Sequence, residues 1–297
     1  TPHTPDPETN HLQKTLKDGY FSTVKPITDR HFRLHGPIVS QMFDAFAEDW
    51  LYASGESLDE SWWPDNTPQQ TRAQPHTESG VNRTTQPSVA QSATAHAGTS
   101  PSAAHQPSAA HTSAPDIACR ALADGPDKAV PETRAVILSA FTSAQSEIFI
   151  RTPYFLPDRE LKAALIRAAL RGVRVSVLLP ERSNIPLFDL VMRANLDGLS
   201  AAGVRIYLTP EPFDHSKTMA IDRYWCLIGS SNMDARSLRL NFEFNIECFG
   251  EGLAGILADD MRERSLISHP YTSQDLANRT LFERAVGRVL WLFTPYL

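Results

Sequence analysis

The sequence predicts an α/β fold in which a mixed, mainly parallel β-sheet is flanked by helices. In the C-terminal part of the chain, short apolar runs alternate with stretches of helical period, and the connections between them are short. Strand, helix, strand, helix and strand in this order are typical of parallel strands joined by crossover helices. Strands are expected at residues 147–151, 173–179 and 204–208, and helices between them at 158–171 and 187–202.

Further elements are expected on both sides of this unit. After it, the pattern predicts strands at residues 218–221, 224–228 and 241–249 and helices at 252–267 and 273–293. A helix at residues 132–146 should precede it. Nearer the N-terminus, residues 31–35 alternate like a short strand, and 38–50 carry apolar residues at helical spacing after Gly36-Pro37.

A sharp change in composition divides the chain into three segments. Residues 64–117 are rich in Pro, Ser, Thr, Ala, Gln and His and repeat Ser-Ala-Ala-His at 102–105 and 108–111. Such a segment buries too little apolar surface to offset its chain entropy, so we expect a disordered linker there, with solvated histidines. It would separate a small segment, 1–63, from a larger domain, 118–297.

The formal net charge of −6 is unevenly distributed along the chain. Residues 1–63 hold 10 acidic and 5 basic residues, whereas residues 118–297 hold 21 of each. This balance argues against a nucleic acid as substrate of the larger domain. The three cysteines are too widely spaced for a disulfide framework or a metal cluster and fit a reducing compartment. The sequence contains neither a signal-peptide pattern nor a long apolar stretch typical of a membrane span.

The densest group of polar residues is the segment 215–222, which reads His-Ser-Lys-Thr-Met-Ala-Ile-Asp. His215 and Lys217 are two residues apart at the start of an expected strand, so their side chains should point to the same side. An imidazole beside a fixed ammonium suits attack on a phosphodiester. The imidazole acts on phosphorus or on the leaving oxygen, and the ammonium neutralises charge on the non-bridging oxygens.

Two more polar segments follow, and the three together lie within 33 residues. Residues 229–232, Gly-Ser-Ser-Asn, offer hydroxyl, amide and backbone N–H groups to phosphate oxygens. In 241–247, Asn and Glu alternate with apolar residues, and a carboxylate there is a candidate to hold a histidine Nδ1–H. Each alone has an ordinary explanation, as a turn or a solvated strand face. Their order and proximity favour a functional site.

The pattern His-x-Lys-x-x-x-x-Asp followed by Gly-Ser-Ser-Asn resembles the HKD motif of the phospholipase D superfamily. Over residues 117–297 the sequence is similar to the second half of bacterial cardiolipin synthases. The segments that carry this similarity are 124–127, 152–158, 171–173, 202–207, 215–222, 228–243 and 294–297. A weaker resemblance, at 29–37 and 46–50, is to the segment that follows the family's first HKD motif.

The resemblance implies roles for the motif residues and a phospholipase D-like α/β sandwich as the fold. His215 would be one of two catalytic histidines, and Lys217 would bind the phosphoryl group. Asp222 would support the geometry of the motif, and Glu243 would orient His215.

The resemblance also implies the substrate and the reaction. Ser230 and Asn232 would contact the phosphate oxygens of the substrate. A phosphatidyl group would pass from one phosphatidylglycerol to another through a phosphohistidine, which releases glycerol and gives cardiolipin. The family needs no metal and no other cofactor for this reaction, and nucleic acid is not expected as a partner.

One departure from the family pattern stands out. The family has two HKD motifs in each chain, whereas here Lys217 is the one lysine with a histidine two residues before it. Residues 1–63 would then be a remnant of the first phospholipase D-like repeat, and 118–297 the second, catalytic domain. We expect the other motif to come from missing upstream sequence, so that this chain is a fragment, or from a second copy of the chain. The isolated monomer is then expected to lack full transferase activity.

The family's usual membrane helices would also lie upstream. This chain would then be peripheral, on the cytoplasmic face of the bacterial cell membrane, with phosphatidylglycerol and anionic lipid as partners. Two alternatives stay open from the sequence. One is a homodimeric single-motif phosphodiesterase or nuclease of the superfamily, and the other is a catalytically inactive remnant.

Three further features have both a functional and an ordinary interpretation. Residues 154–156, Tyr-Phe-Leu, either line an acyl path or belong to the core. Residues 281–293 would form an amphipathic helix, suited to a membrane surface or to packing on the domain. Four arginines either receive an anionic headgroup or are surface residues: Arg193, Arg205, Arg236 and Arg239.

Overall fold

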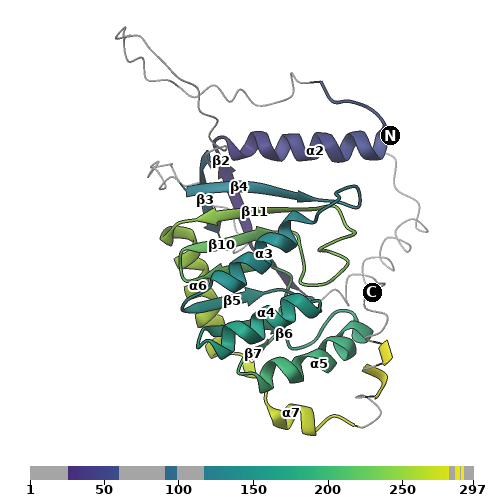
Figure 1. The fold of residues 1–297 in the computed structure, drawn as a ribbon, viewed down its shortest axis with the longest axis vertical. Helices are drawn as coiled ribbons and strands as arrows, with labels where there is room; N and C mark the ends of the chain where they lie inside the picture. The colour runs from purple at the N-terminus through teal and green to yellow at the C-terminus, as the bar shows by residue number, and fades with distance from the viewer. Residues whose placement is uncertain (1–25, 60–90, 99–116, 281–284, 288, 291–297) are drawn as a thin grey trace, which may run out of the picture.

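The structure is a computed structural model that describes residues 26–59, 91–98, 117–280, 285–287 and 289–290. Its centre is a ten-stranded sheet with the order β12-β7-β6-β5-β9-β10-β11-β4-β3-β2 (Figure 1). Helices lie against both faces of this sheet. The expected α/β class, with a mixed sheet flanked by helices, is therefore confirmed.

The predicted β-α-β-α-β unit forms one half of the sheet. Its strands pair in parallel, β5 with β6 and β6 with β7. The crossover helix α4 begins where Asp158 caps it, because the Asp158 carboxylate accepts hydrogen bonds from the backbone N–H groups of Glu160 and Leu161. The elements of the unit are β5 (Glu147–Arg151), α4 (Arg159–Leu170), β6 (Arg174–Pro180), α5 (Pro186–Ala201) and β7 (Arg205–Thr209).

The other half of the sheet is antiparallel, so the expectation of a mainly parallel sheet is wrong. Within the described part of this sheet, β5–β6 and β6–β7 are the parallel pairs, and the remaining neighbours are antiparallel. A parallel pair needs a crossover of a dozen or more residues, whereas three residues join β9 to β10. The antiparallel strands are β9 (Thr218–Ile221), β10 (Trp225–Gly229), β11 (Glu243–Phe249), β4 (Ile117–Asp124), β3 (Gln91–Gly98), β2 (His31–His35) and β12 (His269–Pro270).

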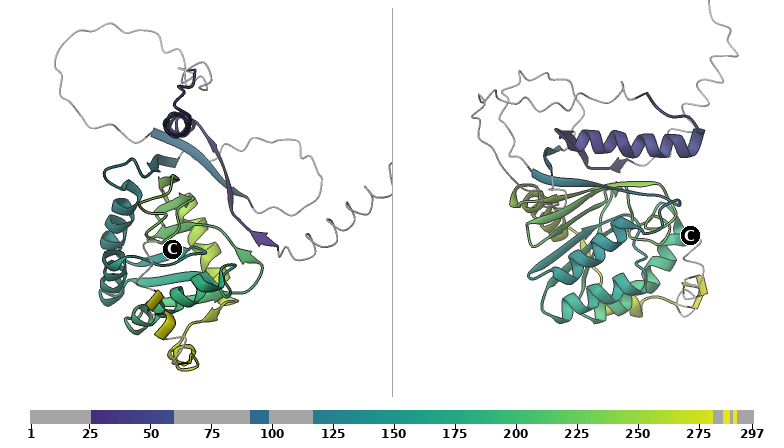
Figure 2. Two further views of the ribbon diagram at one scale, coloured as in Figure 1. Left: turned by 90° about the vertical axis from the view of Figure 1, so that its right-hand side faces the viewer. Right: turned by 45° about the horizontal axis from the view of Figure 1, so that its top comes forward.

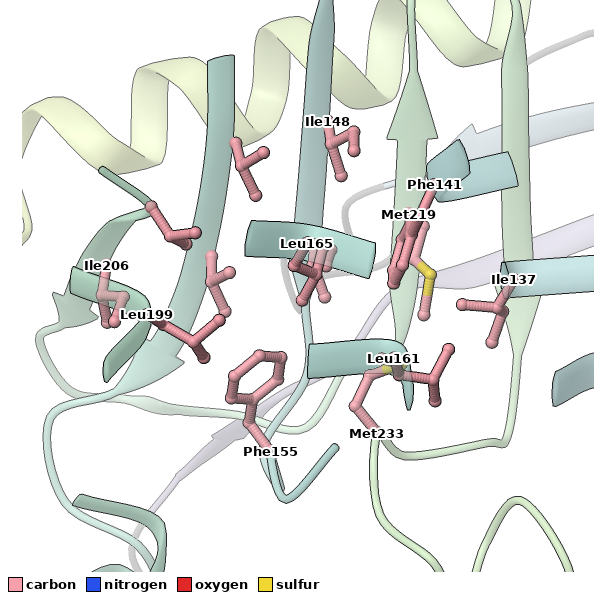
Figure 3. Close-up of a cluster of buried hydrophobic side chains, with 14 of the residues drawn as sticks. Ile137, Phe141, Ile148, Phe155, Leu161, Leu165, Leu199, Ile206, Met219 and Met233 are labelled. Atoms are coloured by element: carbon pink, nitrogen blue, oxygen red, sulfur yellow. The ribbon is translucent and has the colours of Figure 1, made fainter. Parts of the chain in front are cut away.

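Helices α3 (Glu132–Ser143), α4 and α5 form a layer on one face of the sheet, and α6 (Glu251–Leu266) covers the other face (Figure 2). Strand β5 shows how the sequence serves both layers. Its Ile148 and Ile150 point to the larger core under α3, α4 and α5, and Phe149 points to the core under α6. Figure 3 shows the larger core, in which Phe141, Leu161 and Leu165 meet side chains of the strands.

The N-terminal segment packs onto the larger domain. Helix α2 (Ile38–Ser54) lies along the β2–β3–β4 side of the sheet (Figure 1) and ends at Gly55, whose φ of 74° is the left-handed conformation that glycine tolerates. The Gln41 side chain accepts a hydrogen bond from the backbone N–H of Ala121 at 2.9 Å. A second, two-stranded sheet pairs β1 (Ile27–Thr28) in parallel with β8 (Phe213–Asp214). Residues far apart in the sequence therefore meet next to His215.

Two expectations about secondary structure are corrected. Strand β3 lies inside the segment that was expected to be disordered. It forms because its backbone pairs with both β2 and β4, and the composition of the segment does not reveal such pairing. The rest of that linker lies outside the described residues. The prediction of a single helix over 273–293 is also wrong, since α7 (Ser273–Ala277) ends before a turn at Asn278. Most of the expected amphipathic helix at 281–293 lies outside the described residues.

None of the helices that the structure describes combines the length and the apolar character needed to cross a bilayer.

Candidate active site

His215 lies in the short connection between β8 and β9, where two segments far apart in the sequence meet. Its backbone N–H donates to the carbonyl of Thr28 at 2.8 Å, which extends the pairing of β1 with β8. Strand β9 then begins at Thr218, one residue after Lys217. The backbone of the N-terminal segment therefore fixes the position from which the imidazole projects.

The imidazole of His215 contacts a charged side chain at each ring nitrogen. Its Nδ1 is 3.3 Å from Oδ2 of Asp29, and its Nε2 is 3.0 Å from Nζ of Lys217. The Lys217 ammonium also donates to the backbone carbonyl of His215 at 2.5 Å. The structure thus brings His215 and Lys217 together on one side, as their spacing predicts.

Asp29 is a site residue that the sequence analysis did not assign. A carboxylate on Nδ1 holds the Nδ1–H tautomer of an imidazole and leaves the Nε2 lone pair for chemistry. The resemblance gave this role to Glu243, which the structure does not place in hydrogen-bond contact with His215. The one available signal was that Asp29 opens the weaker resemblance at 29–37.

Glu243 contacts other polar residues of the site. Its carboxylate accepts a short hydrogen bond from the Ser230 hydroxyl, and Asn241 Nδ2 donates to Oε1 at 3.2 Å. Glu243 also lies close enough to Lys217 to act on the lysine electrostatically. Glu243 and Ser230 are together because β10 and β11 pair up to Gly229 and Asn245, directly before Ser230.

Lys217 is a partly buried cation surrounded by carboxylates. Burial lowers the pKa of Lys217 from its usual value of 10.5, because the charged form loses water. Four carboxylates oppose this shift in the pKa of the lysine: Asp29, Glu243, Asp214 and Asp234. The result is an ammonium that is poorly hydrated and therefore well suited to bind an arriving anion.

The turn after β10 is tightly held. A Cβ atom at Gly229 would lie 2.5 Å from the carbonyl oxygen of Phe244, so a larger residue does not fit there. Asn245 holds the turn by donating to the Ser231 hydroxyl at 2.7 Å. In the same turn Asn232 donates to the Ser237 hydroxyl at 3.3 Å. The backbone that carries Ser230 and Asn232 is thus fixed, and Ser230 contacts Glu243 while Asn232 contacts Ser237.

Asp222 lies at the opposite end of β9, away from His215 and Lys217. The four residues of β9 separate it from Lys217, and the five steps along the extended chain correspond to roughly 16 Å. Its carboxylate accepts hydrogen bonds from the backbone N–H groups of Gln145, Ser146 and Glu147 at 2.7–2.9 Å. Asp222 therefore anchors the β9–β10 turn to the start of β5 and supports the motif without touching the site.

Replacing Asp222 with Asn is expected to lower the free energy of unfolding by about 1–3 kcal/mol, because Gln145 N–H loses its acceptor. Asn tolerates the φ of 52° at this position, so the backbone is not strained. Burial raises the pKa of Asp222, but the N–H donors outweigh it and lower the pKa below 3.8. The stabilisation is therefore present above pH 4 and lost in acid. Urea unfolding at pH 7 and pH 3 would show a larger difference at pH 7.

A cavity of about 230 Å³ opens beside Lys217, between the N-terminal segment and the sheet. Asp29 and Lys217 are its polar side chains next to the imidazole, and the apolar wall includes Phe32, Met42 and Phe244. The cavity therefore joins the charged site to an apolar space of limited size.

The other candidates from the sequence lie elsewhere. Arg193 is engaged with the Asp189 carboxylate at 3.1 Å and with the Glu181 carbonyl at 2.5 Å, so it is not free to bind a headgroup. Phe155 is fully buried in the larger core, which supports the ordinary interpretation of residues 154–156 (Figure 3). Arg205, Arg236 and Arg239 make no contact with His215 among the described interactions. The described residues hold no group of side chains arranged to bind a metal ion.

The sequence matches known proteins over the region that contains His215 and Lys217. Residues 137–264 match the family model described as "Cardiolipin synthase, PLD-like domain". The cardiolipin synthase of Clostridium perfringens is 30% identical over 181 residues, which cover 61% of this chain and 38% of that protein. Cardiolipin synthase 2 of Staphylococcus epidermidis is 33% identical over 181 residues, covering 61% and 37%. The chain thus spans well under half the length of these relatives.

Two solved structures are also similar. The phospholipase D family member Nuc of Salmonella typhimurium gives a TM-score of 0.45 at 22% identity, covering 52% of this chain and 98% of that one. The phosphatidylserine synthase of Haemophilus influenzae gives 0.46 at 16% identity, covering 60% and 45%. The family model and the curated relatives show a phospholipase D-like domain in this chain, at residues 137–264. This domain is of the cardiolipin synthase type.

Proposed function

We propose that this chain supplies one of the two HKD motifs of a cardiolipin synthase-type phosphatidyltransferase. The observation that carries the proposal is the His215 imidazole, with a carboxylate at Nδ1 and the Lys217 ammonium at Nε2. In this arrangement Nε2 is the reactive nitrogen, and a cation stands where a phosphate would arrive. The names of the curated relatives support phosphatidyl transfer as the reaction.

In the first step, the phosphate diester of phosphatidylglycerol would lie between the two side chains. Lys217 would donate to a non-bridging oxygen and release the Nε2 lone pair of His215. If His215 is the nucleophile, Nε2 forms a bond to phosphorus while the bond from phosphorus to the glycerol oxygen breaks. The histidine of the other motif gives its proton to that oxygen, and glycerol leaves.

In the second step, a hydroxyl of another phosphatidylglycerol would attack phosphorus. The histidine of the other motif takes the proton of this hydroxyl, the N–P bond breaks, and cardiolipin is formed. If His215 is instead the acid, the two histidines exchange roles and the balance of atoms is the same. Either way, a single histidine cannot be nucleophile and acid at once. The second motif is therefore part of the proposal.

Polar groups beside Lys217 would complete the phosphate site. Ser230 and Asn232 offer a hydroxyl and an amide from a rigid turn, and Glu243 holds the Ser230 hydroxyl. The apolar wall of the cavity beside Lys217 suits the glycerol and acyl portion of a lipid. We propose that the chain works at the cytoplasmic face of the bacterial cell membrane, on phosphatidylglycerol and in contact with anionic lipid.

The domain organisation belongs to the same proposal. Residues 118–297 would be the second phospholipase D-like domain, and 1–63 the remaining part of the first repeat. The first repeat would then contribute Asp29 to the histidine of the second. This interpretation is supported by the position of Asp29 in the segment whose sequence resembles the end of a first repeat.

The pH dependence of anion binding tests the proposed role of Lys217. The affinity for inorganic sulfate, which does not titrate above pH 8, is expected to fall as pH rises through the pKa of Lys217, which burial lowers from its usual value of 10.5. In Lys217→Arg the cation stays charged, so sulfate binding should persist over this range. Calorimetric titrations at constant ionic strength measure both. An equal alkaline loss of affinity in Lys217→Arg would contradict the assignment.

A second function has one observation in its favour. The His215 side chain is 43% exposed, so a second copy of the chain has access to it. Two copies would then pair their single motifs, as in homodimeric phosphodiesterases and nucleases of the superfamily. A chain that binds phosphate without turnover would instead be an inactive remnant.

The dependence of turnover on protein concentration separates these functions. We expect the purified chain, as a monomer, to make no cardiolipin from phosphatidylglycerol vesicles. Turnover that rises with the square of the chain concentration, with dimers seen by sedimentation, would support self-pairing. Cardiolipin synthesis that is linear in the concentration of a proven monomer would overturn the two-motif mechanism.

A further inference from the structure

Two arginines from distant segments converge on one carboxylate of α6. Arg30 Nη2 donates to Oδ1 of Asp260 at 2.7 Å, and Arg151 Nη2 donates to Oδ2 at 2.5 Å. Arg30 belongs to the N-terminal segment, and Arg151 is the last residue of β5. Asp260 therefore joins the helix on one face of the sheet to both a strand end and the N-terminal segment.

Arg151 is a buried cation, which makes this junction costly unless it is well paired. Its side chain is 3% exposed, and its Nε is 3.7 Å from Oδ2 of Asp214. Its Nε and Nη1 atoms have no hydrogen-bond partner among the described residues. A guanidinium does not lose its charge in proteins, so the two carboxylates compensate it. An apolar residue would fill this position with a smaller desolvation cost. The charges therefore point to a role in fixing the relative positions of the segments that they join.

The residues held by this cluster are the direct neighbours of the His215–Asp29 pair. Arg30 follows Asp29 and donates its backbone N–H to Asp29 Oδ1 at 2.9 Å. Asp214 precedes His215 and, through Arg151, is linked to the same Asp260. Asp29 is thus next to Arg30, which Asp260 holds directly. His215 is next to Asp214, which is linked to Asp260 through Arg151.

We propose that Asp260 is a positioning residue that holds Asp29 against Nδ1 of His215. Asp260 binds Arg30 and Arg151 and so ties both to α6. This keeps His215 in the tautomer with a free Nε2. The inference rests on the proposed function for its catalytic meaning. The structural part of the proposal concerns only the tautomer of the His215 imidazole, which can be measured without turnover.

The test is the tautomer of His215 in this chain, read from the ¹⁵N shifts of labelled imidazole at a pH above the usual range of histidine titration. In the unchanged chain we expect the Nδ1–H tautomer. Asp29→Asn should lose this preference and serves as the reference for complete loss. Asp260→Asn is expected to shift the population toward the Nε2–H form, in the direction of Asp29→Asn.

Asp259→Asn is the matched control, since it removes the neighbouring carboxylate of the same helix. Asp259 pairs with Arg223 and Arg262, neither of which reaches the His215–Asp29 pair. This variant should keep the tautomer of the unchanged chain. If Asp260→Asn fails to fold, Arg30→Gln cuts the same link at a residue of the N-terminal segment and should also shift the tautomer.

The proposal is overturned if the folded Asp260→Asn and Arg30→Gln variants keep the Nδ1–H tautomer while Asp29→Asn loses it. The β1–β8 pairing alone would then hold the pair in place. Failure of the proposed function looks different. It would appear as phosphatidyl transfer by the native protein that is unaffected by His215→Ala, whatever the tautomer in the Asp260 variant.

Discussion

Replacing His215 with Ala in the native protein is expected to reduce phosphatidyl transfer by about 10³-fold or more. Whether His215 is the nucleophile or the acid, both of the proposed steps use its Nε2, which lies 3.0 Å from Lys217 Nζ. The measurement is cardiolipin formation from phosphatidylglycerol vesicles by protein isolated from its source, with the change made in its own gene.

His269→Ala is the control for this variant. His269 lies on β12, at the far edge of the sheet, where its imidazole pairs with Asp275 at 2.9 Å. Its loss should leave transfer unchanged. Because His215 is partly exposed, its replacement creates no large cavity and the fold should be retained. Equal activities of the two variants would remove His215 from the mechanism.

Asp29→Asn is expected to lower the kcat of the native protein by about 10²–10⁴-fold with a small change in KM. Changing the carboxylate that orients a catalytic imidazole has an effect of this size in serine proteases, because the amide stabilises the wrong tautomer. Asp29 contacts His215 at Nδ1 and leaves Nε2 to the substrate, so the loss should fall on the chemical steps.

Glu243→Gln provides the comparison, because the resemblance assigned the orienting role to Glu243. In the structure this carboxylate binds Ser230 and Asn241, so its loss should weaken phosphate binding and raise KM. Steady-state kinetics of both variants separate the two roles. If Glu243→Gln lowers kcat more than Asp29→Asn does, Glu243 is the orienting carboxylate and the assignment of Asp29 is wrong.

The strongest local patterns in the sequence predicted their elements well. Strand β5 is a short apolar run, the helix α4 after it carries apolar residues at helical spacing, and Asp158 marks the start of α4. The motif spacing also placed His215 and Lys217 side by side. These features depend on neighbours in the sequence, which is why a single sequence contains them.

Features that depend on distant pairing were missed. Asp29 and His215 are separated by 186 positions, and no local pattern links them. Strand β3 consists of small and polar residues and forms through backbone pairing to both neighbours. The antiparallel half of the sheet could have been predicted from the sequence, because three residues between β9 and β10 are too few for a crossover connection. The contacts at Asp260 also join three segments that are distant in the sequence, the N-terminal segment, β5 and α6, and that come together only in the folded chain.

The identity of the products tests the central claim most directly. Native protein would be incubated with vesicles of labelled phosphatidylglycerol, and cardiolipin and free glycerol would be quantified together. Phosphatidyl transfer predicts equal amounts of the two products, and a loss of both by about 10³-fold or more in His215→Ala protein. Phosphatidic acid without cardiolipin, or cleavage of a nucleic acid with phosphatidylglycerol left intact, would contradict it.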